Sequence, residues 1–115
     1  MSKQNIAVLT LTVTAVGAIA AHRFIHAAGD QAVAGENALG VSRTSAASGE
    51  NFPVDVLGTT LVQAGAEISK GDSLKADADG KAITWATSGA KVAIALEAAT
   101  AADQIIEVLL IQNVA

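Results

Sequence analysis

The first clear pattern in the chain is an alternation of apolar and hydroxyl side chains near its start. Leu9, Leu11 and Val13 alternate with threonines, and a period of two is typical of a β-strand whose two faces differ. Ile6 and Val8 share the parity of the threonines, so the apolar side changes after Val8. This change predicts a β-bulge between Val8 and Leu9, or an arm up to Val8 that packs against something other than the strand's own sheet.

Four later segments show strand patterns: 52–57, 83–86, 92–97 and 105–111. The alternation in 92–97 predicts that its larger side chains face the core and that its alanines face outward. Residues 105–111 are apolar on both faces except at Glu107, which predicts a central strand covered on both sides.

Turn sequences such as Gly35-Glu36, Ser48-Gly49 and Asp79-Gly80 separate these segments. Short strands at this spacing predict an all-β fold, a small β-barrel or β-sandwich of short antiparallel strands resembling the β-clip. Residues 98–102 (AATAA) have the composition for one helical turn, but no window has a sustained helical period. We expect an N-terminal arm and first strand over 1–15, followed by one β-rich domain over 16–115.

Residues 6–21 also have the apolar character of a secretory signal peptide, and they are too short for a membrane-spanning helix. A leader does not require alternating leucine and threonine, so we expect a mature N-terminal strand. A secreted or periplasmic binding domain without catalysis is the alternative interpretation.

Composition narrows the possible functions. Alanine supplies 26 of 115 residues and there is no cysteine, which excludes disulfides and thiolate metal sites. The net charge is −4, and the acids lie after residue 29, whereas Lys3 and Arg23 precede it. An acidic chain without a basic run argues against nucleic-acid binding. So much alanine predicts close backbone packing or a partner subunit.

Candidate metal sites have incomplete patterns. His22 and His26 are four residues apart, but Arg23 stands where the metalloprotease motif has glutamate. Residues 77–80 (Asp-Ala-Asp-Gly) resemble part of a calcium loop, yet Lys75 and Ala86 occupy its two terminal ligand positions. We therefore expect two partly exposed histidines and a hairpin turn, with no metal.

Candidate catalytic groups are equally incomplete. Gly35 and Gly40 have the spacing of a phosphate loop without its lysine, so a turn is expected at both. Asp55, Glu97 and Glu107 lie in predicted strands, where solvent-facing carboxylates are common. Lys81 is the only candidate for a carrier-domain lysine, and its neighbours do not fit. We expect no enzyme, no cofactor and no small-molecule substrate.

The most distinctive local pattern is Ile68-x-x-Gly71-Asp72-x-Leu74, in which a turn joins two apolar residues, as at the corner of a small β-barrel. Ala64-Gly65 precedes Gly71-Asp72 at the same interval at which Ala28-Gly29 precedes Gly35-Glu36. This echo is compatible with a pseudo-symmetric barrel, although two short copies are close to chance.

Three blocks carry a family resemblance: GDQAVAGENALGVSRTSAASGENFPVDVLGT (29–59), AGAEISKGDSLKADADGKAITWA (64–86) and VAIALEAATAADQIIEVLLI (92–111). Together they resemble the capsid cement or head-decoration proteins of tailed bacteriophages. The resemblance covers about three quarters of the chain, and its motifs are structural.

The resemblance implies a trimeric β-rich protein that binds the outer capsid surface and bridges neighbouring major capsid proteins, without nucleic-acid or membrane contacts. Such a protein is made in the host cytoplasm and resides in the virion. For the capsid contact we predict Lys3, Ile6, Val8 and Leu9. For an oligomer interface we predict Ile106, Val108 and Leu110, because the apolar strand 105–111 needs cover on its outer face.

Overall fold

The computed structural model describes residues 7–86 and 89–111, in which all regular structure is β. The described strands are β1 (Ala7–Thr14), β2 (Phe24–Ile25), β3 (Gly40–Ser42), β4 (Asn51–Gln63), β5 (Ser73–Ala76), β6 (Ala82–Thr84), β7 (Ala93–Ala95) and β8 (Ile105–Leu110). Within the described part of the chain, no helix is long and apolar enough to cross a membrane.

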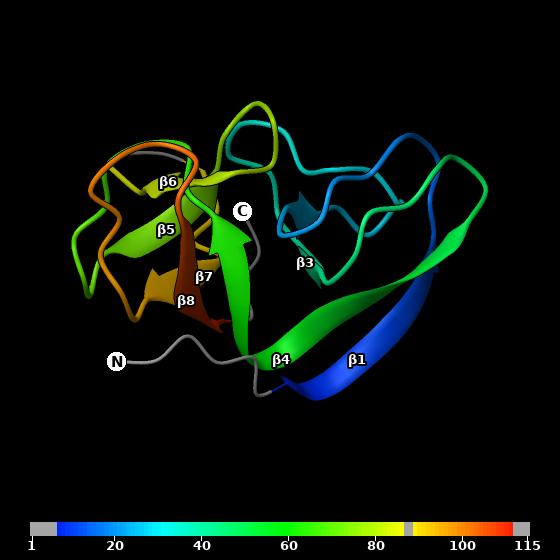
Figure 1. The fold of residues 1–115 in the computed structure, drawn as a ribbon, viewed down its shortest axis with the longest axis horizontal. Coiled ribbons are helices and arrows are strands. Elements are labelled where there is room, and N and C mark those ends of the chain that lie inside the picture. The colour runs from blue at the N-terminus through cyan, green and yellow to red at the C-terminus, as the bar shows by residue number, and fades with distance from the viewer. Residues whose placement is uncertain (1–6, 87–88, 112–115) are drawn as a thin grey trace.

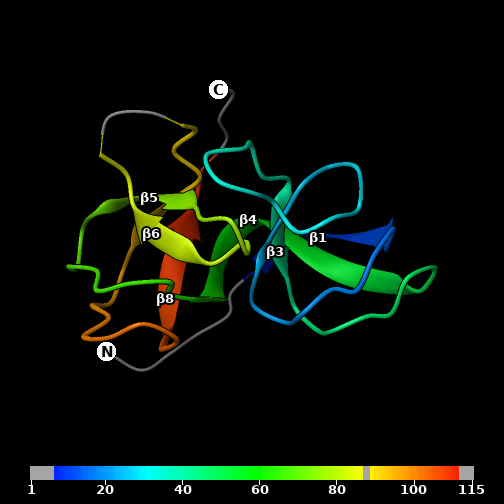
Figure 2. The ribbon, with the colours of Figure 1, turned by 90° about the horizontal axis from the view of Figure 1, so that it is seen from above.

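The strands form one antiparallel sheet that curls into a nearly closed barrel, which confirms the predicted fold class. Their order is β2-β3-β4-β8-β7-β5-β6, and β1 pairs with β4 outside this path (Figures 1 and 2). The two ends of the path meet where the N–H of Phe24 donates to the carbonyl of Gly80, at 2.8 Å. A second bond runs from the N–H of Gly35, in the loop between β2 and β3, to the carbonyl of Ala76 in β5, at 3.0 Å.

The chain folds as two similar halves that share β4. The first part of β4 pairs with β1 and β3, and its second part pairs with β8. Between them lies Gly58, whose positive φ of 98° suits glycine best. Figure 1 shows β4 running from one lobe of the molecule into the other.

Equivalent backbone hydrogen bonds establish the correspondence between the halves. Ile19 and Ala46 exchange both N–H···O bonds at 2.8 and 2.9 Å, and Ile68 and Ala99 exchange both at 2.9 Å. The carbonyls of Ala15 and Ala64 each accept one N–H at 2.7 Å. The internal repeat therefore exists, but Ala64 corresponds to Ala15. The echo predicted with Ala28 has the wrong register.

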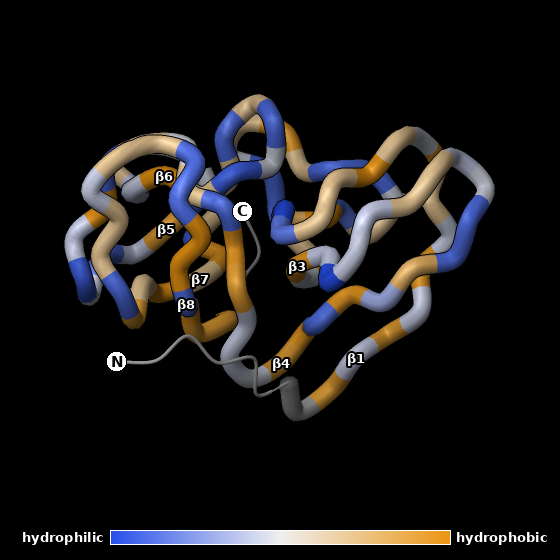
Figure 3. Tube along the Cα trace, in the orientation of Figure 1, coloured by the Kyte–Doolittle hydropathy of each residue, from blue (hydrophilic) through white to orange (hydrophobic). Residues whose placement is uncertain are grey.

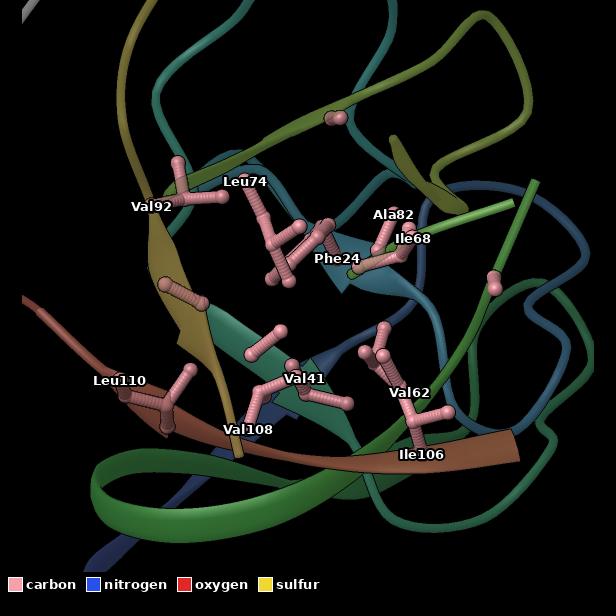
Figure 4. Close-up of a cluster of buried hydrophobic side chains, with 14 of the residues drawn as sticks. Phe24, Val41, Val62, Ile68, Leu74, Ala82, Val92, Ile106, Val108 and Leu110 are labelled. Atoms are coloured by element: carbon pink, nitrogen blue, oxygen red, sulfur yellow. The ribbon is translucent and has the colours of Figure 1, made fainter. Parts of the chain in front are cut away.

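Two hydrophobic clusters stabilise the fold. The larger one fills the barrel and combines residues of both halves, including Phe24, Leu74 and Ile106, whose side chains converge in Figure 4. The smaller cluster lies under β1 and the first part of β4, and it contains Phe52 and Val54. Figure 3 shows the apolar positions along β4 and β8 and the hydrophilic ones in the connecting loops.

Several strand predictions are confirmed. The register of β1 on β4 shifts on both sides of Leu9, which is the predicted bulge. Strand β8 is central between β4 and β7, as expected, although Leu109 on its outer face is 38% exposed. The Ile68–Leu74 corner buries both of its apolar ends, at 2% and 0% exposure.

Other strand predictions need correction. In β7 the buried residues are Ala93 and Ala95, whereas Ile94 is only partly buried. The face predicted to point outward thus points into the barrel. The narrow interior of the bent barrel accommodates only small side chains there. Residues 98–102 form no helical turn, since Ala99 pairs with Ile68. Glu97 follows β7 instead of lying within it.

Candidate functional site

An apolar groove lies between β1, β4 and the loop that precedes β3. Its volume is about 450 Å³, and Leu9 and Leu11 from β1 line one side of it. Their side chains are 43% and 40% exposed. The rest of its lining is His26, Ala27, Asn37, Ala38, Leu39, Val56, Leu57 and Ile111.

The same groove contains a buried polar atom without a partner. The side-chain carbonyl oxygen of Asn37 is inaccessible to solvent and accepts no hydrogen bond. A buried acceptor in this state costs about 1–3 kcal/mol, and such groups are rare in native proteins. His26 lines the same groove, and its Nδ1 accepts the N–H of Ala28 at 3.2 Å.

The buried carboxylate of Asp55 connects β4 to β1 and to Arg43, the residue that follows β3. Asp55 is fully buried and accepts hydrogen bonds from the hydroxyls of Thr10 and Thr60, both at 2.9 Å. The guanidinium of Arg43 lies 3.2 Å from its Oδ1. The carboxylate is therefore paired and hydrogen-bonded, which is how a buried charge is tolerated. Its role is to fix β1 against β4.

The residues considered above as metal ligands have structural roles. His22 and His26 flank β2 and are both partly exposed, as predicted, and the described residues contain no group of three or more potential metal ligands. Asp77 Oδ1 accepts the N–H groups of Asp79 and Lys81 at 2.8 and 2.9 Å, which confirms the hairpin turn.

The two glycines with phosphate-loop spacing differ from each other. Gly35 has a positive φ of 73° and belongs to a turn, as predicted. Gly40 opens β3 instead, and the prediction of a turn there is wrong. A Cβ at this position would clash with the backbone carbonyl oxygen of Asp55. This glycine therefore allows β3 and β4 to approach closely.

Comparison with known proteins identifies the family. A family model described as "Phage cement protein" matches residues 3–110. The chain belongs to the phage cement protein family. Cement proteins are structural components associated with the phage capsid and are not enzymes.

The fold of this cement protein is similar to that of the head fiber gp8.5 N base of bacteriophage phi29. The TM-score is 0.73 at 21% sequence identity, and the match covers 90% of this chain and 93% of that chain. At this identity the likeness shows the fold. No curated protein matches the chain.

Of the predicted contact residues in this cement protein, Leu9 is the one whose side chain is described. It is exposed and lines the groove. Val8 lies in β1, and its side chain is outside the described part of the structure, as are Lys3 and Ile6 altogether.

The residues predicted for an oligomer interface lie in the interior of the cement protein. Ile106, Val108 and Leu110 are at most 8% exposed and belong to the main cluster. Their own chain already covers them, so an interface at β8 would have to use the opposite face of that strand, where Leu109 is exposed.

Sequence reasoning missed two groups in the groove. Leu11 belongs to the apolar face that the alternation predicts, but a regular alternation does not reveal whether anything covers that face. Asn37 lies in a loop between glycines, and a lone asparagine there is typical of a turn. The signal that could have found the site is the absence of charge from the whole of β1.

Proposed function

We propose that this protein binds the outer surface of a phage capsid and stabilises it by bridging neighbouring major capsid proteins. The observation that carries the proposal is the exposed apolar surface of Leu9 and Leu11 on β1. Solvent-exposed leucines that line a groove of about 450 Å³ are typical of an interaction site. Membership of the cement family supports a capsid as the partner.

In this proposal residues 1–15 are the contact arm and residues 16–115 the rigid body. Lys3 pairs with acidic groups of the capsid, and Ile6, Val8 and Leu9 are its apolar anchors. The first 29 residues carry two bases and no acid, so the arm does not repel an acidic surface.

A homotrimer completes the mechanism. Three modest contacts on one rigid assembly bind at high effective concentration, so their combined affinity exceeds that of one arm by orders of magnitude. We propose that the outer face of β8, with Leu109, lies nearest the three-fold axis. Sedimentation velocity at micromolar concentration tests this, and a monomer would rule the trimer out.

Co-sedimentation with purified capsids tests the function. We expect the full chain to sediment with capsids and to reduce DNA release on heating. Deleting residues 2–8 should abolish binding, while far-UV circular dichroism shows an intact body. Deleting residues 2–6 removes Lys3 and Ile6 but leaves β1 whole, so it should weaken binding less than the 2–8 deletion does. Undiminished binding by the 2–8 deletion would contradict the role of the arm.

A further inference from the structure

Strand β1 has an outer edge that nothing in the described structure covers. It is eight residues long, and within the described residues it pairs with β4 alone. Its sequence, AVLTLTVT, contains no charge, proline or glycine. Proteins usually protect an exposed edge with such residues or with short strands, since a long uncharged edge is a template for another strand.

The direction of the backbone groups along this edge follows from the pairing. Pro53 is opposite Thr12, and its carbonyl accepts the N–H of Arg43 at 3.1 Å, so it points toward β3. Facing residues in an antiparallel ladder alternate between bonded and non-bonded pairs. The N–H and C=O of Thr12 therefore point away from β4, as do those of Thr10, whereas Leu11 bonds to β4.

Side chains on the two faces of β1 define what could lie beside it. On one face are Leu9, Leu11 and the apolar groove, with the unpartnered oxygen of Asn37. On the other face are the hydroxyl residues Thr10 and Thr12, both exposed. An added strand would therefore need apolar side chains on the groove side and polar ones on the threonine side.

We propose that the edge of β1 accepts an extended segment of the major capsid protein as an additional antiparallel or parallel strand. Strand addition of this kind takes affinity from main-chain hydrogen bonds and specificity from alternate side chains. The inference rests on the proposed function, and it specifies how the contact is made. Strand β1 is itself part of the contact arm, so the edge is continuous with the capsid contact proposed above.

A second copy of the chain fits this edge less well. If β1 paired with β1 of another copy, the two would be related by a two-fold axis, and the interface would be complete with two chains. Such a pair would occupy the contact strand and would not build a three-fold assembly.

The substitution Thr12→Pro tests the edge directly. Proline removes the outward N–H of Thr12 and leaves the ladder to β4 intact, and edge strands tolerate proline where the N–H faces solvent. We expect capsid affinity to fall about tenfold or more, because one hydrogen bond is lost from each of several linked contacts. Thr12→Val is the matched control, since it keeps the N–H and should bind as the wild type does.

Hydrogen exchange provides a readout that needs no variant. In the wild-type protein bound to capsids, the amides of Thr10 and Thr12 should become protected, while the amide of Leu11 should be protected with or without capsids. Equal exchange of the outward amides in the free and bound protein would overturn the added strand even if Thr12→Pro failed to fold.

The outcomes separate this inference from the proposed function. If the wild type does not sediment with capsids, the proposed function fails. If the wild type binds and Thr12→Pro binds equally well, or if Thr12→Val is weakened as much as Thr12→Pro, only the strand addition fails. If Thr12→Pro converts a wild-type dimer into a monomer without affecting capsid binding, a second copy occupies the edge and the capsid segment is ruled out.

Discussion

Asp55 explains more directly than any other residue why β1 lies where it does. Its carboxylate is fully buried, yet Thr10, Thr60 and Arg43 together satisfy both oxygens. One of the alternating threonines that predict the strand, Thr10, thus also donates a hydrogen bond to the carboxylate that anchors the strand. The sequence contained the threonines and the aspartate, but their 45-residue separation hid the contact.

Asp55→Ala should destabilise the protein by about 2–4 kcal/mol, because it leaves the buried hydroxyl of Thr60 without its acceptor and removes the ion pair with Arg43. The free energy of unfolding in urea measures this. Glu67→Ala, at an exposed position, is the control and should change the free energy by less than about 0.5 kcal/mol. Equal effects of the two substitutions would mean that Asp55 does not anchor the strand.

The surface pair of Lys81 and Asp103 predicts a pH effect. The Lys81 ammonium donates a hydrogen bond to Asp103 at 2.6 Å, and this bond, with the charge of Lys81, lowers the pKa of that carboxyl below 3.8. A carboxyl with a depressed folded pKa adds stability above its unfolded pKa. That contribution is lost as the pH falls through the folded value.

An NMR titration of the Asp103 carboxyl carbon should therefore give a lower pKa in the wild type than in Lys81→Met. The stability difference between the two proteins should be present at neutral pH and should disappear in strong acid. A titration midpoint that does not move in Lys81→Met would contradict the pairing.

At the scale of elements, turn chemistry was the most predictable feature. Residues 33–36, 47–50 and 69–72 form turns of one design, each with glycine at a positive φ in the third position. In each turn the acid at the fourth position accepts the N–H of the first residue, at 3.0, 2.7 and 3.0 Å. Local hydrogen bonds of this kind depend on neighbouring residues, so they can be inferred from sequence.

Strand faces were less predictable, because they depend on partners far away in the chain. β2 and β3 have two and three residues, too few for any periodicity. In β7 the larger side chains suggested the wrong inner face. The barrel is lined there by Ala93 and Ala95, opposite Val108 and Leu110, and the bulk of the opposing strand determines which face is inside.

Ala95→Leu tests this assignment of faces. Inserting three carbons into the packed interior should cost about 1–3 kcal/mol. Ala98→Leu, the same substitution at an exposed position three residues later, should be nearly neutral. Thermal unfolding distinguishes the two, and a neutral result at Ala95 would restore the face originally predicted from the alternation.

At the scale of the whole molecule, the abundant alanines have a specific place. The main cluster contains eight of them, Ala32, Ala64, Ala76, Ala82, Ala90, Ala93, Ala95 and Ala99. Small side chains let short, bent strands from two similar halves approach each other around a narrow interior. The composition indicated close packing, and the structure locates it inside the barrel of a single chain.

The two halves nevertheless cannot be independent folding units. They share β4, and Phe24, from the first half, is fully buried in a cluster supplied mainly by the second. We therefore expect Phe24→Ala to destabilise both halves together, by about 3–5 kcal/mol. Fluorescence of Trp85, the only tryptophan, reports on the second half, and far-UV circular dichroism reports on the whole chain.

In urea, both signals should give one coincident transition for the wild type, and both midpoints should shift equally in Phe24→Ala, as two-state unfolding requires. Phe52→Ala, in the smaller cluster of the first half, is the informative companion. It too should shift the urea midpoint reported by Trp85, because both halves share β4 and destabilising the first part of this strand also destabilises its second part. A Trp85 transition unaffected by Phe52→Ala would mean that the barrel unfolds separately from the β1–β4 ribbon.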